Sequence, residues 1–188
     1  MQRNLIWTPS HPGYVSGRYY QNTPLIYTDS SSTGVLTVNS LTYTPFRIDK
    51  NVIFDRFAIS CAGTVANGAA RFGIYTNKNG VPGNLLVDTG EIIAATSGIK
   101  EAIISFSASL LDWYWYAGAT PVPPNLYNGI TFLGNNYLLG QATPTSTSAT
   151  ASIRQSGFTY GAMPSVAPID NLSFITGNLA PLFWLRAG

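Results

Sequence analysis

Short segments that alternate apolar and polar residues, each ended by glycine, proline or asparagine, run through this chain from residue 34 onward. A period of two is typical of strands with one buried face, and no window repeats apolar residues at the spacing of an amphipathic helix. Strands at intervals of roughly 8–12 residues are typical of sandwiches and barrels, and about eight can be counted. The pattern predicts an all-β fold, an antiparallel two-sheet jelly-roll-like sandwich.

Two segments show the pattern best. Residues 100–110 place four apolar side chains on one face, namely Ala102, Ile104, Phe106 and Ala108, opposite Ile103 and three serines. Residues 71–75 form an arginine-led strand that runs into Asn79-Gly80 and Pro82-Gly83, two pairs that favour turns. Residues 140–157 are rich in serine and threonine without a pattern, which predicts a loop, and residues 181–187 predict a final strand.

Residues 1–33 differ from the rest and predict an extended N-terminal arm before a domain at 34–188. Prolines and glycines are too dense there for a regular helix. The arm nevertheless carries aromatic side chains, among them Trp7, Tyr14, Tyr19 and Tyr20. Exposed aromatic groups are costly, so we expect these four to dock the arm against a surface, either its own domain or a neighbouring molecule.

Charged residues are scarce. Lysine and arginine number 10 and aspartate and glutamate 8, so that 10% of the chain is charged, against roughly 25% in an average soluble domain. A nucleic-acid-binding protein needs a dense basic surface, so this class is excluded. Weakly charged surfaces repel one another little, which predicts a homo-oligomer. The alternative is a stable β domain of the extracellular type with a hydroxyl-rich surface.

Cysteine content and hydropathy limit the setting. Cys61 is the one cysteine, so an intrachain disulfide and a multi-cysteine zinc site are excluded, and its strand spacing with Ile59 predicts burial. The start of the sequence has no apolar region of the secretory type. No run approaches the roughly 18–20 apolar residues of a membrane span. We expect synthesis in a cytoplasm without export by the usual route.

Catalytic patterns are weak. His11 is the one histidine, and the prolines around it argue against an oriented general base. Two acidic residues could pair for glycoside hydrolysis, but most of the acids fall at turns or strand ends, and Asp55 is explained by an ion pair with Arg56. The acidic residues are Asp29, Asp49, Asp55, Asp88, Glu91, Glu101, Asp112 and Asp170. Phosphate-binding and metalloprotease motifs are absent from the sequence. We expect no enzymatic activity, cofactor or metal.

Aromatic side chains are the remaining candidates for recognition. In the strand predicted at 111–117, Trp113 and Trp115 share one face and Tyr114 and Tyr116 the other. Together with Tyr127 and Tyr137 they could stack on sugar rings. Consecutive aromatics on a strand more often fill a core or a subunit interface, and we favour that interpretation over a glycan platform.

Several segments together resemble small β-sandwich virion proteins of tailed bacteriophages, including tail-fibre and receptor-binding proteins. They are GRYY at 17–20, LTYTPF at 41–46, FDRFAI at 54–59, ARFGIYTNKNGVPGNLLVDTGEI at 70–92, WYWYA at 113–117, YGAMPSVAP at 160–168 and PLFWLR at 181–186. The resemblance implies a homotrimeric jelly roll mounted on a virion, made in the host cytoplasm and contacting other virion proteins. It leaves open a tail component, a host-attachment domain that binds surface glycans, and a capsid decoration protein.

Overall fold

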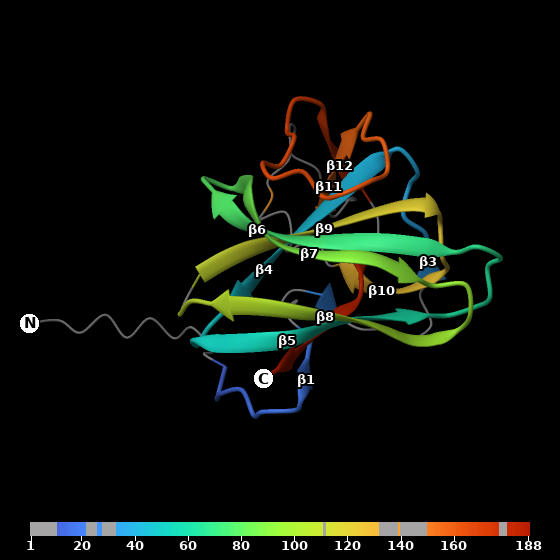
Figure 1. Cartoon of the computed structure of the whole chain (residues 1–188). Helices are drawn as coiled ribbons and strands as arrows, with labels where there is room; N and C mark the ends of the chain where they lie inside the picture. Colours follow the sequence, from blue (N-terminus) through green and yellow to red (C-terminus); the bar gives the residue numbers. More distant parts are fainter. Residues whose placement is uncertain are drawn as a thin grey trace, which may run out of the picture.

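The computed structural model of the chain describes residues 11–21, 26–27, 33–110, 112–131, 139, 150–176 and 180–188 (Figure 1). These residues form strands that pair antiparallel throughout. The strands are β1 (Tyr19–Tyr20), β2 (Ile26–Tyr27), β3 (Thr33–Gly34), β4 (Ser40–Ile48), β5 (Val52–Cys61), β6 (Ala69–Lys78), β7 (Val81–Ile93), β8 (Gly98–Ala108), β9 (Asp112–Val122), β10 (Leu126–Thr131), β11 (Thr150–Ser156), β12 (Leu172–Thr176), β13 (Ala180–Pro181) and β14 (Phe183–Ala187). Among the described residues, no helix is both long and apolar enough to cross a membrane.

Eight of these strands have the connectivity of a jelly roll. One sheet contains β3, β10, β5 and β8 in that order, and the other contains β4, β9, β6 and β7. From β3 to β10 the chain changes sheet at every step except between β6 and β7. The two sheets pack face to face (Figure 1). The predicted all-β sandwich is therefore confirmed, and its strand order is that of a double-sheet jelly roll.

Six further strands widen the two sheets. β14 lies between β5 and β1, β13 and β2 pair with β10, and β11 and β12 extend the β4 sheet. The prediction of a patternless loop at 140–157 is wrong for residues 150–156, which form β11; residues 140–149 lie outside the described part. β11 pairs with β4 and buries Ser152, Ile153 and Gln155. A strand with only one large apolar residue carries little periodic signal.

The turn chemistry was predicted in part. Asn79 and Gly80 have positive φ values of 52° and 86°, as a tight hairpin between β6 and β7 requires. Pro82-Gly83 was expected to make a second turn and instead lies inside β7. A Cβ atom on Gly83 would lie 2.6 Å from Thr76 Oγ1, so a glycine is needed for close packing rather than for turning.

The main core fills the space between the two sheets and is dominated by aromatic rings. The Phe183 ring centroid lies 5.3 Å from those of Phe46 and Phe57 and 4.2 Å from that of Tyr116. Tyr116 is fully buried and donates its hydroxyl to Pro181 O at 2.8 Å. Cys61 is buried in the same core, as predicted, and desolvation raises the pKa of its thiol.

A second apolar cluster lies on the outer face of the β4–β9–β6 sheet. It contains Tyr43, Tyr75, Trp115, Ile153 and Met163 among its buried members. Residues 158–168, which we call the strap, cover it. The Tyr75 hydroxyl donates to Pro164 O at 3.0 Å and the Tyr43 hydroxyl to Pro168 O at 3.4 Å. Burial raises the pKa of both tyrosines well above the usual value.

The described part of the arm lies against its own domain. Tyr14 stacks edge-on against Phe54 of the core at 5.3 Å, and burial is the main cause that raises its pKa to about 12. β1 pairs Tyr19 and Tyr20 with β14. From the sequence, the arm could dock either on its own domain or on a neighbouring molecule. Tyr14, Tyr19 and Tyr20 contact their own domain. Trp7 lies outside the described residues.

Candidate functional site

The aromatic strand β9 separates its side chains as the alternation predicts. Tyr114 and Tyr116 face inward and belong to the main core. Trp115 faces outward and is only 2% exposed, while Trp113 is half-buried beside it. Tyr127 is half-buried on β10, in the other sheet, and Tyr137 lies outside the described residues. Of the six predicted contact residues, the structure therefore brings only Trp113 and Trp115 together at one surface.

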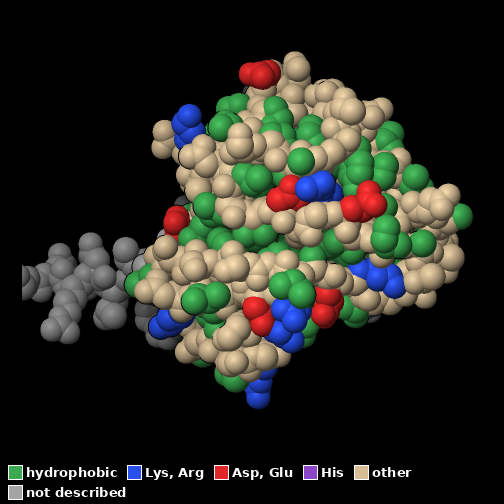
Figure 2. Space-filling view, in the orientation of Figure 1, with side chains coloured by type: hydrophobic (Ala, Val, Ile, Leu, Met, Phe, Trp, Pro, Cys, Tyr) green, Lys and Arg blue, Asp and Glu red, His purple; other side chains and the backbone are tan. Residues whose placement is uncertain are grey.

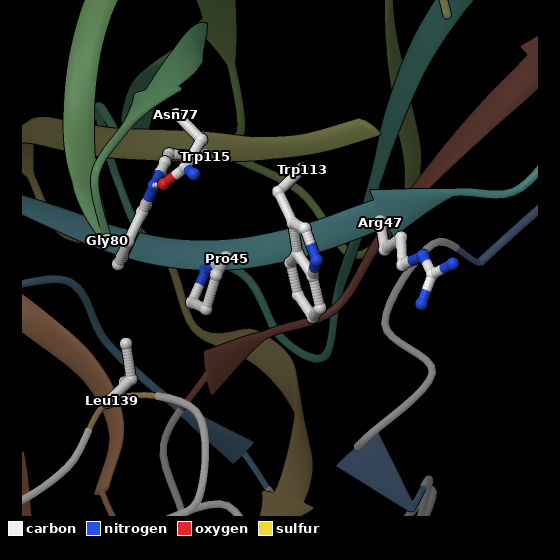
Figure 3. Close-up of a pocket in the computed structure, with 7 residues that line it drawn as sticks. All are labelled: Pro45, Arg47, Asn77, Gly80, Trp113, Trp115 and Leu139. Atoms are coloured by element: carbon white, nitrogen blue, oxygen red, sulfur yellow. Dashed lines mark hydrogen bonds between the residues drawn. The ribbon is translucent and has the colours of Figure 1, made fainter. Parts of the chain in front are cut away.

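These two tryptophans line a pocket of about 530 Å³ at one end of the β4–β9–β6 sheet (Figure 3). Its other lining residues are Pro45, Arg47, Asn77, Gly80 and Leu139. The rings of Pro45 and Trp113 lie on the same side of the sheet (Figure 3). β4 can carry a proline here because its pairing with β11 ends at Tyr43, so that no described strand pairs with β4 on that side at Pro45.

Three pocket residues form a row across neighbouring strands. Arg47 of β4 is paired with Trp113 of β9. On the other side Thr76 is paired with Tyr114, so that Asn77 of β6 occupies the next position, opposite Trp113. Adjacent strands are spaced by about 4.8 Å. The strand of Arg47, β4, and the strand of Asn77, β6, therefore lie roughly 10 Å apart, with the indole of Trp113 between them.

A hydrogen bond lies at one end of this row and an ion pair at the other. Trp115 Nε1 donates to Asn77 Oδ1 at 2.9 Å, which turns the Asn77 amide nitrogen away from Trp115. Arg47 Nε lies 3.0 Å from Asp49 Oδ1, so this ion pair orients the guanidinium. The pocket therefore offers an aromatic surface flanked by oriented N–H donors, an arrangement suited to binding a polar ring rather than to breaking bonds.

A second surface lies on the outer face of the β5–β8–β14 sheet. Ile53, Ile99 and Ile103 are 59%, 58% and 78% exposed, and we call this surface the isoleucine face. Figure 2 shows apolar side chains there beside a small group of acidic and basic ones. A groove of about 350 Å³ opens next to Ile99, lined also by Tyr19, Ala58, Glu101 and Trp184.

Polar contacts fix the walls of that groove. The Tyr19 hydroxyl donates to Glu101 Oε1 at 2.6 Å, and the Arg186 guanidinium lies 5.9 Å from the Tyr19 ring centroid. Arg186 also forms a bidentate pair with Asp55, with distances of 2.8 and 2.6 Å. The ion pair that the sequence predicted between Asp55 and Arg56 is present, with Arg56 NH1 3.8 Å from Asp55 Oδ2, and Arg56 NH1 also donates to Asp55 O at 2.9 Å. Arg186 is the closer partner, and its hydrogen bonds lower the pKa of Asp55.

Asp88, Glu91 and His11 also serve contacts within the fold. Asp88 pairs with Arg71, Glu91 Oε2 accepts from the Tyr160 hydroxyl at 2.8 Å, and His11 stacks on Tyr14 at 4.2 Å. Gly13 N–H donates to His11 Nδ1 at 3.1 Å, which engages the nitrogen that a general base would use. No group of three or more histidine, cysteine, aspartate or glutamate residues within the described ranges could hold a metal ion.

Sequence reasoning missed two parts of these surfaces. Arg47 and Asn77 join Trp113 only through strand register, which no local pattern contains. Ile103 did carry a signal, because it is the single large apolar residue on the polar face of residues 101–109, where serines dominate. In comparisons with known proteins, no protein-family model, no curated protein and no solved structure matches this chain.

Proposed function

We propose that this chain is a non-enzymatic structural module of a tailed-phage virion that assembles with copies of itself and with other virion proteins. Its segments resemble those of small virion β-sandwich proteins, and that resemblance implies a homotrimer and a location on the tail or particle surface. The jelly-roll order of its strands and the scarcity of charge agree with this role. Asp49, Asp55 and Asp88 each form an ion pair with an arginine, which supports a non-enzymatic role.

The isoleucine face is the observation that carries the proposal. Three isoleucines, each more than half exposed, lie on one sheet face beside an apolar groove. Burying apolar surface contributes about 25 cal/mol per Å², so covering these three side chains would stabilise an assembly. A chain with 10% charged residues has few charges with which to keep such faces apart.

The test is incorporation into particles. A double variant, Ile99→Ser with Ile103→Ser, should reduce the amount of this chain per purified particle at least tenfold. The matched control is Val166→Ser, since Val166 is 61% exposed on the strap, away from this face. Normal occupancy of the double variant, or absence of the unaltered chain from purified particles, would contradict the proposal. Immunolabelling of intact particles distinguishes a tail component from a capsid decoration protein.

A second function, attachment to host-surface glycans, is favoured by the Trp113 pocket. A half-buried indole beside an amide and a guanidinium is suited to stacking on a sugar ring and binding its hydroxyls. A glycan array probed with the purified chain should give signals that Trp113→Ala abolishes. Silence of the unaltered chain on the array and on intact host cells would leave only the assembly role.

The arm also belongs to the assembly proposal. Tyr14, Tyr19 and Tyr20 contact their own domain, so removal of residues 1–30 would damage the fold as well as any docking. A truncation that removes residues 1–10 deletes Trp7 and leaves β1 in place. If the arm docks on a neighbouring virion protein, this truncated chain is folded but under-represented in particles. If the truncated chain is incorporated into particles in the normal amount, Trp7 has no docking role.

A further inference from the structure

We infer that the Trp113 pocket takes a pyranose that carries a carboxylate, with the sugar ring on the indole and the carboxylate directed to Arg47. This inference rests on the second proposed function, glycan binding, and adds the chemical class of sugar and its orientation. It depends on the row Arg47–Trp113–Asn77 and on the contacts at its ends, the Arg47–Asp49 ion pair and the hydrogen bond from Trp115 to Asn77.

The indole supplies the platform. Trp113 is half-buried on the outer face of β9, next to the ring of Pro45 (Figure 3). Its neighbour Trp115 is almost fully buried in the outer cluster and forms a rigid side to the pocket. A flat apolar surface with a fixed edge accommodates the apolar C–H face of a pyranose, whose hydroxyls then project sideways into the plane of the row.

The two ends of the row differ chemically, which gives the sugar a direction. Asn77 Oδ1 is occupied by Trp115 Nε1, so the amide presents its nitrogen as a donor at one end. Arg47 presents the N–H groups of its terminal nitrogens at the other end. With the strands of these residues roughly 10 Å apart, a ring stacked on the indole between them can place an exocyclic group near each end.

Arg47 favours a carboxylate over a hydroxyl. Its Nε forms an ion pair with Asp49 Oδ1 at 3.0 Å, which places Asp49 on the Nε side of the guanidinium and leaves the two terminal nitrogens as a fork for a ligand. A carboxylate accepts two parallel N–H bonds from such a fork, and charge-assisted bonds are about twice as strong as neutral ones. Because Asp49 balances the charge of Arg47, the preference arises from directed donors rather than from a net positive field.

Binding of matched sugars to the full chain tests this inference. The probes are glucuronic-acid-containing and N-acetylneuraminic-acid-containing oligosaccharides, each compared with its carboxyl-reduced form by isothermal titration. The unaltered chain should bind the acidic form at least tenfold more tightly. Arg47→Gln should abolish that preference while retaining the weaker binding of the reduced form, and Arg47→Lys should restore part of it. Trp113→Ala should abolish binding of both forms.

Leu86→Ala is the control, because Leu86 is an exposed apolar residue on β7 outside the lining of the pocket, and this variant should bind as the unaltered chain does. Thermal midpoints of all variants show whether each is folded. If the unaltered chain binds acidic and reduced sugars equally and Trp113→Ala binds neither, the acidic specificity is overturned and glycan binding by the pocket is retained. Absence of binding to every probe would overturn both, and neither result bears on assembly through the isoleucine face.

Discussion

Arg71 and Asp88 form a bidentate ion pair across β6 and β7, with Nε–Oδ1 and NH2–Oδ2 distances of 2.6 and 2.7 Å. Asp88 also accepts the backbone N–H groups of Gly90 at 2.9 Å and Met163 at 3.0 Å. Because Met163 lies in the strap, this one carboxylate joins the β6–β7 hairpin to the segment that covers the outer cluster. The arginine-led strand seen in the sequence thus has a structural role.

Replacement of Asp88 should destabilise the strap. Asp88→Asn keeps the shape of the side chain but removes its charge. It also replaces one acceptor oxygen with an amide NH₂ group, which faces an N–H donor that the carboxylate now accepts from. We expect a loss of about 2 kcal/mol in the free energy of unfolding, which corresponds to a fall of roughly 4–8 °C in the thermal midpoint. Amide hydrogen exchange should rise most at residues 160–168. An unchanged exchange rate there would contradict this role.

The same carboxylate makes stability depend on pH. Burial opposes ionisation of Asp88, but its hydrogen bonds from Arg71, Gly90 and Met163 outweigh burial and hold its pKa below the usual 3.8. A depressed pKa contributes stability that is present above the unfolded value and lost as the pH falls through the folded value. The stability difference between the unaltered chain and Asp88→Asn should therefore be constant near neutral pH and shrink below about pH 4. A difference that persists at pH 2 would contradict this assignment.

The two strap-bonded tyrosines should differ in effect. Tyr75→Phe removes a 3.0 Å hydrogen bond to Pro164 O, whereas Tyr43→Phe removes a longer one of 3.4 Å to Pro168 O. Loss of a well-formed bond to a carbonyl costs about 1 kcal/mol. Urea unfolding of the two variants should show the larger loss for Tyr75→Phe. Equal or reversed losses would mean that strap closure does not depend on these hydroxyls.

Phe183 should be among the most sensitive positions in the main core. Its ring contacts those of Phe46, Phe57 and Tyr116, which come from both sheets. Phe183→Ala removes these contacts and leaves a cavity at a cost of about 3–5 kcal/mol. Chemical denaturation measures the loss, and the conservative Phe183→Leu is the control, with a smaller expected loss. A cost below 1 kcal/mol would contradict the central position of this ring.

Substitutions of Trp113 and Trp115 should affect different properties, glycan binding and stability respectively, although the two residues share a strand face. Trp115 is buried in the outer cluster, so Trp115→Ala should cost about 3–5 kcal/mol. Trp113 is half-buried, so Trp113→Ala should cost about 1 kcal/mol or less while abolishing glycan binding. Unfolding curves and sugar titrations on the two variants test this. Similar stability losses would contradict the placement of the two indoles.

Local patterns predicted the elements whose signal lies within one strand. In β8 the alternation of Ala102, Ile104 and Phe106 against exposed residues appears as predicted. The hairpin at Asn79-Gly80 followed from the positive φ that these residues tolerate. The separation of Tyr114 and Tyr116 from the tryptophans onto opposite faces of β9 followed from the period of two, whereas the placement of the tyrosines in the main core did not.

Long-range contacts account for what the sequence did not predict. β14 enters the sheet between β5 and β1, and β11 pairs with a strand more than 100 residues earlier in the chain. The strap is held by Asp88, Tyr75 and Tyr43, whose partners lie 75 to 125 residues away. The pocket row needs the register of β4, β9 and β6 together. None of these relationships leaves a periodic trace in a local window.

Sedimentation equilibrium of the purified full chain at micromolar concentration tests the central claim most directly, namely assembly through the isoleucine face. We predict a mass that is a multiple of 20.2 kDa, with three copies as the resemblance implies. The double variant of Ile99→Ser and Ile103→Ser should sediment as a folded monomer. An unaltered chain that sediments at 20.2 kDa, or a double variant with unchanged mass, would contradict the account.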